Sequence, residues 1–318
     1  MAFPAVAVLG ATGRIGRLLQ RQGAAGLDLR LQARAPQPGS PAPGSGWHIF
    51  DPLADPAALA RFAAGAQVLL CLAGPVPGRG SGGMEAHIRL GEAAVRAAAA
   101  AGAPGARVLL ASSAAVYGSR PGLLTEEAPL APANAYGAAK AEMEARAQAL
   151  GEALGVAVTS LRIGNVAGFD AILGGWRPGF RLDRFADGQS PRRSYIGPLC
   201  LARVLAELLM QPGLPAVLNL AQPGAVEMAA LLRAAGRAFS WQAAPAGAIP
   251  AVELGTARLQ ALLPGPLPPA DPGRLAAEWA ALEPHSGPEQ TSAEQTSAEQ
   301  TGMGQNNMGQ NNMGHSRG

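Results

Sequence analysis

The stretch AVAVLGATGRIG, residues 5–16, decides the fold, because a short apolar run leads directly into three evenly spaced glycines. The run predicts a buried strand, and the residues after Gly13 predict a helix. Gly10 permits a sharp turn, Gly13 lets the backbone approach a pyrophosphate, and Gly16 lets the helix lie close to the strand. The positive end of that helix would face the phosphates. The stretch therefore predicts the dinucleotide-binding turn of a βαβ unit.

The alternation of apolar runs and Ala-rich stretches continues as far as residue 162. It is typical of repeated βαβ units, so we expect an α/β fold with a doubly wound parallel sheet, the Rossmann fold. The expected strands cover residues 5–9, 28–33, 47–50, 67–72, 107–111 and 157–162. The expected helices cover residues 14–21, 56–63, 85–101 and 136–154.

The pattern loosens after Arg162 and indicates a smaller C-terminal lobe, with helices at 199–210 and 226–235 and a strand at 216–220. We expect a nucleotide-binding domain at residues 1–168 and a substrate lobe at 169–284, interleaved with the end of the first domain. The repeats TSAEQTSAEQ and MGQNNMGQNNMG fall in residues 285–318, which we expect to be a disordered tail because they supply little apolar surface. The Pro- and Gly-rich residues 36–46 predict a mobile loop.

Composition excludes several classes of protein. The formal net charge is only +3, and no segment interleaves basic with aromatic residues, so we expect no nucleic-acid partner. Cys71 and Cys200 lie far apart in apolar surroundings, which indicates buried reduced thiols and no metal site. No apolar run reaches the roughly 18 residues that a membrane span requires. The N-terminus also lacks the features of a signal peptide, so we expect a cytoplasmic protein that does not bind membranes.

Two further motifs point to catalysis. SSAAVYG, residues 112–118, follows an apolar strand, and YGAAK, residues 136–140, begins a helix. Tyr136 and Lys140 would project from one helix face, where an ammonium beside a phenol favours the phenolate and allows proton exchange with a substrate. A Tyr and a Lys one turn apart can also simply decorate a solvated helix face.

Together with the Gly-x-x-Gly-x-x-Gly turn, these motifs resemble the extended short-chain dehydrogenase/reductase family, also called the NAD-dependent epimerase/dehydratase family. The resemblance covers roughly residues 5–282. It implies hydride transfer between a nicotinamide cofactor and a hydroxyl or keto carbon, such as that of a nucleotide-sugar. Ser113, Tyr136 and Lys140 would be catalytic, with Ser113 also contacting the substrate and Tyr136 and Lys140 also contacting the cofactor. The implied cofactor contacts in the turn are Gly10, Thr12, Gly13, Arg14, Ile15 and Gly16.

Further contacts follow from the same resemblance. It implies Asp51 at the adenine, although an aspartate here could instead cap a helix, a role that Asp55 ahead of Pro56 would fill. It also implies cofactor contacts at Ala73, Gly74 and Ile163, substrate contacts at Asn165 and Arg193, and a homodimer through the helices of Glu85 and Tyr136. The substrate lobe is short, and His87 and Ile88 stand where the family has a helix Asn.

The end of the second expected strand bears on the choice of cofactor. NAD-specific relatives usually carry an acidic residue there, whereas this chain has Ala33 followed by Arg34. A guanidinium can pair with the 2′-phosphate of NADP, so we expect NADP to be favoured over NAD. The alternative is that Arg34 points to solvent and that the protein accepts either cofactor.

Two other kinds of function stay open. The first is a non-catalytic dinucleotide sensor or scaffold, since a fold alone never establishes catalysis. The second is a flavin-type reductase that needs no tyrosine. The combination of Ser113, Tyr136 and Lys140 argues against both, because a sensor needs no proton donor.

Overall fold

The computed structural model describes residues 4–22, 26–36, 46–75 and 83–282 of the chain. Contacts between residues divide the chain into a compact unit Met1–Ala280 and a second unit Ala281–Gly318. The expected disordered tail and most of the expected mobile loop, residues 37–45, lie outside the described residues. Among the described helices, none has both the length and the apolar character needed to cross a membrane.

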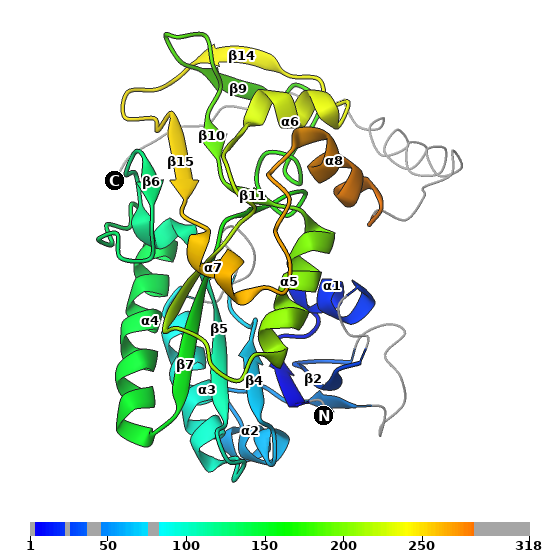
Figure 1. Cartoon of the computed structure of the whole chain (residues 1–318), viewed down its shortest axis with the longest axis vertical. Coiled ribbons are helices and arrows are strands. Elements are labelled where there is room, and N and C mark those ends of the chain that lie inside the picture. Colours follow the sequence, from blue (N-terminus) through cyan, green and yellow to red (C-terminus); the bar gives the residue numbers. More distant parts are fainter. Residues whose placement is uncertain (1–3, 23–25, 37–45, 76–82, 283–318) are drawn as a thin grey trace, which may run out of the picture. The chain divides into compact units, whose positions relative to one another are not determined.

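In the described part of the chain, a seven-stranded parallel sheet forms the centre of the first unit (Figure 1). Its order is β12-β7-β5-β4-β1-β2-β3, and each neighbouring pair is parallel. The strands are β1 (Ala5–Leu9), β2 (Asp28–Ala33), β3 (Trp47–Ile49), β4 (Val68–Cys71), β5 (Arg107–Ser113), β7 (Ala157–Ile163) and β12 (Val217–Leu220). The predicted parallel sheet is confirmed.

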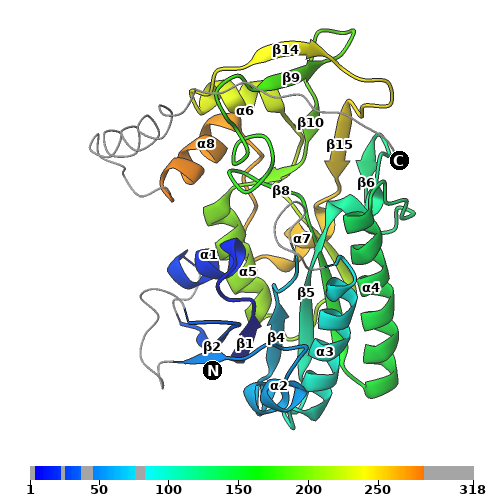
Figure 2. The ribbon, with the colours of Figure 1, turned by 180° about the vertical axis from the view of Figure 1, so that it is seen from behind.

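Helices cover both faces of this sheet, as the two opposite views show (Figure 1 and Figure 2). Helix α1 (Arg14–Gln22) packs against α5 (Pro198–Met210). On the other side, α3 (Ala86–Ala100) packs against both α2 (Pro56–Ala63) and α4 (Ala135–Leu154). Apolar side chains of the sheet and these three helices, among them Phe62, Leu69 and Val95, form one buried core. The doubly wound fold predicted from the sequence is therefore confirmed.

The strand order places a crevice at the carboxyl edge of the sheet. From β1 the chain proceeds through β2 and β3 toward one side, and it then continues through β4, β5, β7 and β12 on the other side. The connections that leave β1 and β4 consequently separate, and ligands of open α/β sheets bind at such a switch point.

A lobe of short strands completes the first unit above that edge (Figure 1). Among the described residues, its largest sheet has the order β13-β10-β15-β6, and two further strand pairs are β11-β8 and β14-β9. These strands are β6 (Leu123–Leu124), β8 (Asn165–Val166), β9 (Arg181–Arg184), β10 (Arg192–Arg193), β11 (Tyr195–Ile196), β13 (Val226–Glu227), β14 (Ser240–Ala243) and β15 (Ala251–Leu254). The helices of the lobe are α6 (Met228–Ala234) and α8 (Pro272–Ala280), while α7 (Ala257–Leu262) packs against β12 of the main sheet.

One predicted element begins differently in the structure. The helix expected at 226–235 starts only at Met228, because Val226 and Glu227 form strand β13 and pair antiparallel with β10. The tertiary partner β10 overrides the helical preference of the local sequence there.

Candidate active site

The glycine turn between β1 and α1 is packed so closely that it leaves no space for side chains. Gly10 has a φ of +78°, and a Cβ atom there would lie 2.7 Å from the Cα and N atoms of Ala73. A Cβ atom on Gly16 would lie 2.6 Å from the carbonyl oxygen of Ala11. The Gly10 amide donates to the side-chain oxygen of Gln32, a buried residue of β2, at 2.9 Å. The turn is therefore held against the ends of both neighbouring strands, β2 and β4.

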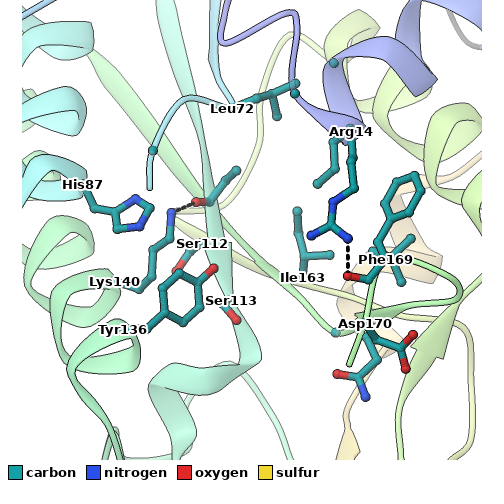
Figure 3. Close-up of a pocket in the computed structure, with 18 of the residues that line it drawn as sticks. Arg14, Leu72, His87, Ser112, Ser113, Tyr136, Lys140, Ile163, Phe169 and Asp170 are labelled. Carbon is teal, nitrogen blue, oxygen red and sulfur yellow. Dashed lines mark hydrogen bonds between the residues drawn. The ribbon is translucent and has the colours of Figure 1, made fainter. Parts of the chain in front are cut away.

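A cavity of about 320 Å³ lies at this edge of the sheet (Figure 3). It lies at the predicted site, because the glycine turn, the ends of β5 and β7 and the start of α4 all contribute to its lining. The predicted site residues that line it are Gly13, Arg14, Ile15, Gly16, Gly74, Ser113, Tyr136, Lys140, Ile163 and Asn165. The predicted residues outside the lining are Gly10, Thr12, Arg34, Asp51, Ala73 and Arg193.

Tyr136 and Lys140 lie one turn apart at the start of α4, and both line the cavity. Asn134 caps this helix, since its side-chain oxygen accepts a hydrogen bond from the Gly137 amide at 2.9 Å. The Nζ atom of Lys140 donates to the Ala111 carbonyl at 2.5 Å and lies 5.8 Å from the centre of the Tyr136 ring. Burial disfavours the ammonium and lowers the pKa of Lys140 to about 8. The lysine is therefore held in place with a charge that can change near neutral pH.

The phenol of Tyr136 is protonated at neutral pH. Burial raises its pKa, and the Ser113 hydroxyl offsets only part of that increase. Burial thus opposes the stabilisation of the phenolate that we expect from the Lys140 ammonium, because the phenolate loses its hydration. A protonated phenol beside the cavity is suited to donate a proton to a carbonyl oxygen.

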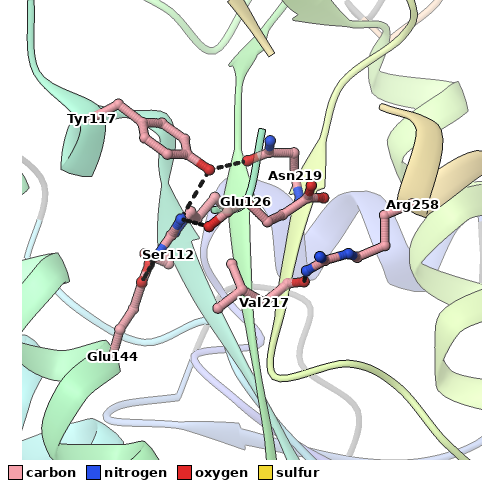
Figure 4. Close-up of polar contacts among 8 residues, drawn as sticks. Ser112, Tyr117, Glu126, Glu144, Val217, Asn219 and Arg258 are labelled. Carbon is pink, nitrogen blue, oxygen red and sulfur yellow. Dashed lines mark hydrogen bonds and ion pairs between the residues drawn. The ribbon is translucent and has the colours of Figure 1, made fainter. Parts of the chain in front are cut away.

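A buried polar network supports the strand that carries Ser113 (Figure 4). Glu144 of α4 and Arg162 of β7 form an ion pair at 2.7 Å, with side chains only 7% and 6% exposed. The Ser112 hydroxyl donates to the same carboxylate, and Arg162 also donates to the Tyr117 hydroxyl at 2.9 Å. The network therefore fixes α4, β5 and β7 relative to one another at the base of the cavity.

The same network continues into the lobe. The Tyr117 hydroxyl donates to the side-chain oxygen of Asn219 in β12 at 2.7 Å. The Asn219 amide group donates to the carbonyl oxygens of Leu124 at 2.9 Å and Gly255 at 3.1 Å. Hydrogen bonds thus connect the carboxyl edge of the sheet to strand β6 and the residue that follows β15.

Arg14 connects the glycine turn to the loop that follows β8 (Figure 3). Its Nη1 atom donates to the Phe169 carbonyl at 2.6 Å, and its guanidinium lies 5.3 Å from the centre of the Phe169 ring. Asp170, the next residue, also lines the cavity, and its Oδ2 atom accepts from the Tyr195 hydroxyl at 2.7 Å. Two walls of the cavity therefore meet through one arginine.

Asp51 and Asp55 both cap turns near the third strand. The Asp51 carboxylate accepts from the amides of Leu53 at 2.8 Å and Ala54 at 3.2 Å. The Asp55 carboxylate accepts from the Ala58 amide at 2.8 Å and caps α2, as the alternative interpretation of this segment predicted. Asp51 is therefore fixed just after the end of β3, outside the cavity lining.

The other predicted residues outside the lining lie in three places. Thr12 and Ala73 belong to the turn and to the end of β4 that supports it, while Arg34 is exposed directly after β2. Arg193 lies half-buried on β10, and its Nη1 atom donates to the Arg192 carbonyl at 2.8 Å.

Several residues contribute to the site without having been predicted as part of it. Among them, His87 and Asp170 line the cavity, and Gln32 positions the Gly10 amide. The replacement of the family's helix Asn was the available signal for His87. The sequence offered no comparable signal for Asp170, because its place depends on the lobe.

The cavity and the glycine turn fit a nicotinamide dinucleotide. Gly13 is exposed, lines the cavity, and lies directly before the first residue of α1, so a pyrophosphate could approach its backbone. From that turn the cavity continues to Tyr136 and Lys140, so one ligand can contact both the glycine turn and these two side chains.

Comparisons with known proteins agree with this geometry. A short-chain dehydrogenase/reductase superfamily protein from Agrobacterium tumefaciens, solved with bound NAD, superposes with a TM-score of 0.68 at 19% identity, covering 87% of this chain and 96% of that one. A putative epimerase from Burkholderia cenocepacia gives 0.67 at 23% identity, over 87% and 98% of the two chains. The UDP-N-acetylglucosamine 4-epimerase from Methanobrevibacter ruminantium, solved with UDP-N-acetylmuramic acid, gives 0.67 at 19% identity, over 88% and 96%.

At these identities the structural matches establish the fold. A search of curated protein sequences found no match. The sequence profile described as "NAD dependent epimerase/dehydratase family" matches residues 6–172, which is more than half of the chain. The chain therefore belongs to the NAD-dependent epimerase/dehydratase family.

Proposed function

We propose that this protein transfers hydride between a nicotinamide dinucleotide and a hydroxyl or keto carbon of its substrate, with Ser113, Tyr136 and Lys140 as catalytic residues. One observation carries the proposal: the glycine turn and these three side chains line the same cavity. A dinucleotide sensor would need the turn alone, because it has no use for a proton donor.

The roles of the three side chains follow from their positions. Tyr136, protonated at neutral pH, donates a proton to the carbonyl oxygen during reduction and recovers it from the hydroxyl during oxidation. Ser113 hydrogen-bonds the same oxygen and stabilises its changing charge. Lys140, held by the Ala111 carbonyl, places positive charge beside the phenol and hydrogen-bonds the cofactor ribose. The nicotinamide, when bound, supplies or accepts the hydride.

Nucleotide-sugars are the substrate class that we propose to test first. The Methanobrevibacter epimerase was solved with a UDP-sugar derivative, and its fold matches most of this chain. On the substrate side of the cavity we assign binding to Asn165, which lines it, and to Arg193, which would have to reorient because it now donates to a neighbouring carbonyl.

We also propose that NADP is preferred over NAD. Arg34 directly follows β2, where its guanidinium can meet a 2′-phosphate. Neither residue 33 nor residue 34 is acidic, so no carboxylate at these positions would repel that phosphate. We also assign dinucleotide contacts to Asp51, which follows β3, and to Ala73, which follows β4. Preference for NADP would favour net reduction of a keto substrate, since epimerases of this family typically retain NAD through a closed cycle.

Two statements about organisation belong to the same proposal. We assign residues 1–168 to dinucleotide binding and 169–284 to the substrate lobe. Helices α3 and α4, which pack side by side, are the proposed face of a homodimer.

A thermal-shift screen tests the function. The protein is melted with NAD, NADP, NADH and NADPH, each crossed with UDP-sugars and simple keto compounds, because specific binding stabilises the folded state. Combinations that raise the melting temperature are then assayed for nicotinamide absorbance change. If none of the four dinucleotides raises the melting temperature, the proposed function is wrong.

A further inference from the structure

His87 occupies the wall of the cavity between the end of β4 and the start of α4 (Figure 3). Its ring meets the Tyr136 ring edge to face, with centroids 5.5 Å apart and planes at 72°. On the other side it packs on Gly74, where a Cβ atom would lie 2.3 Å from both the Cε1 and Nδ1 atoms of the ring. A glycine at position 74 therefore gives the imidazole its space.

The imidazole has unused hydrogen-bonding capacity. The side chain is buried, with the residue only 3% exposed, and neither ring nitrogen has a hydrogen-bond partner in the described part of the chain. Burial and, to a smaller extent, the Lys140 charge lower the pKa of His87 to about 4, although the Pro75 carbonyl opposes part of this decrease. The ring is therefore neutral at physiological pH, with one N–H to donate and one bare nitrogen to accept.

Buried polar atoms in proteins are nearly always hydrogen-bonded, and leaving one unpaired costs free energy. In His87 two such atoms stand unpaired at the wall of a cavity. Packing alone would be served as well by a phenylalanine, which makes the same edge-to-face contact. The two nitrogens point in different directions, so a single ligand group can reach only one of them. A hydroxyl group suits either nitrogen, because it can both donate and accept a hydrogen bond.

The position of His87 identifies the ligand. A dinucleotide that runs from the glycine turn to Tyr136 must cross the carboxyl end of β4, since β4 lies beside β1 in the sheet. Gly74 and His87 lie at that end. The adenosine half would lie beyond the glycine turn, near β2, and the nicotinamide half would face His87.

We propose that His87 binds the nicotinamide half of the dinucleotide through a hydrogen bond between one imidazole nitrogen and a ribose hydroxyl. This inference rests on the proposed function, because it assumes that a nicotinamide dinucleotide occupies the cavity. His87 is assigned to binding and not to proton transfer.

Binding titrations of His87→Phe and His87→Asn test the proposal. NADPH and NADH are titrated by fluorescence, and ADP, which lacks the nicotinamide half, serves as the control ligand. The matched control variant is His48→Phe. His48 also meets an aromatic ring edge to face, that of Phe62, with centroids 5.1 Å apart and planes at 69°, but it does not line the cavity.

We expect His87→Phe to weaken binding of the better dinucleotide about tenfold, the usual effect of a lost hydrogen bond. ADP affinity and the melting temperature should be retained, and His87→Asn should recover part of the affinity because it keeps a donor and an acceptor. His48→Phe should leave dinucleotide affinity unchanged.

Three results would overturn the inference: unchanged dinucleotide affinity in His87→Phe, an equal loss of ADP affinity, or a lower melting temperature that indicates a purely structural role. These outcomes leave the proposed function intact as long as the unaltered protein binds a dinucleotide. Failure of the unaltered protein to bind either dinucleotide would overturn both.

Discussion

Tyr136 is the residue on which the proposed chemistry depends most directly. Its ring is packed between His87 and Lys140, and its hydroxyl is protonated because burial raises the pKa. Neither contact needs the hydroxyl group, so the ring can be retained without it. The proton-donating role can therefore be separated from packing and from cofactor binding.

Tyr136→Phe should lower turnover by about a hundredfold or more, which is the usual contribution of a positioned general acid. Dinucleotide affinity should change little, because the phenyl ring preserves the packing. Initial rates and fluorescence titrations measure the two quantities on the same preparation. Near-normal turnover would contradict the catalytic assignment.

Arg34 tests the choice of cofactor at the same scale. In Arg34→Ala we expect NADPH affinity to fall about tenfold, because a charge-assisted hydrogen bond to the 2′-phosphate is lost. NADH affinity should stay nearly constant, since NADH lacks that phosphate. Equal affinities for both cofactors in the unaltered protein, or an unchanged NADPH affinity in the variant, would refute the proposed preference.

At the scale of elements, α4 is held against β5 and β7 by the Glu144–Arg162 ion pair as well as by apolar packing. The pair is almost fully buried, and the Glu144 carboxylate also accepts a hydrogen bond from the Ser112 hydroxyl. Removing one member leaves a charge in a region that water does not reach, which costs far more than removing an exposed pair. The precise place of the catalytic face of α4 thus depends on a contact that lies beneath it.

Glu144→Gln should destabilise the protein by about 3–5 kcal/mol, because the Arg162 charge remains buried without a counterion. The matched control is Glu142→Gln on the same helix, where Glu142 forms an exposed pair with Arg146 at 2.6 Å. That substitution should cost less than about 1 kcal/mol. Urea unfolding of the two variants measures both values, and equal losses would show that the buried network contributes nothing special.

Local sequence was a good guide to some elements and a poor one to others. The bounds of β1, β2 and α2 agree with the prediction, because β1 is a compact apolar run that ends at Gly10, β2 alternates polar and apolar residues, and α2 begins at the Asp55–Pro56 cap. Strands β10 and β13 are only two residues long and exist because they pair with each other, so no local pattern marks them. The same limit applied to Asp170, which reaches the cavity only through the fold of the lobe.

At the scale of the whole molecule, the buried bases of the cavity make stability depend on pH. The pKa of His87 is about 4 in the folded protein, against 6.5 for a free histidine. The unfolded chain therefore binds a proton at a higher pH than the folded protein does. Stability from this group is complete above about pH 6.5 and is lost as the pH falls toward 4.

His87→Phe should remove this part of the pH dependence. Between pH 7 and pH 4, the unaltered protein should lose roughly 3 kcal/mol more of its unfolding free energy than the variant, as the shift in pKa requires. Chemical denaturation at both pH values measures the difference. An identical pH dependence in the two proteins would show that the buried imidazole is not neutral in the folded state.

The contact between Arg14 and Phe169 predicts cooperative binding of the two ligands. The guanidinium belongs to the turn proposed for the pyrophosphate, and its hydrogen bond also holds the loop that carries Asp170 (Figure 3). A ligand that orders this arginine therefore also orders the loop that the second ligand must meet, and such coupling is reciprocal. We expect each ligand to raise the affinity of the protein for the other. Titrations of one ligand with and without the other measure this coupling, and Arg14→Ala should weaken it.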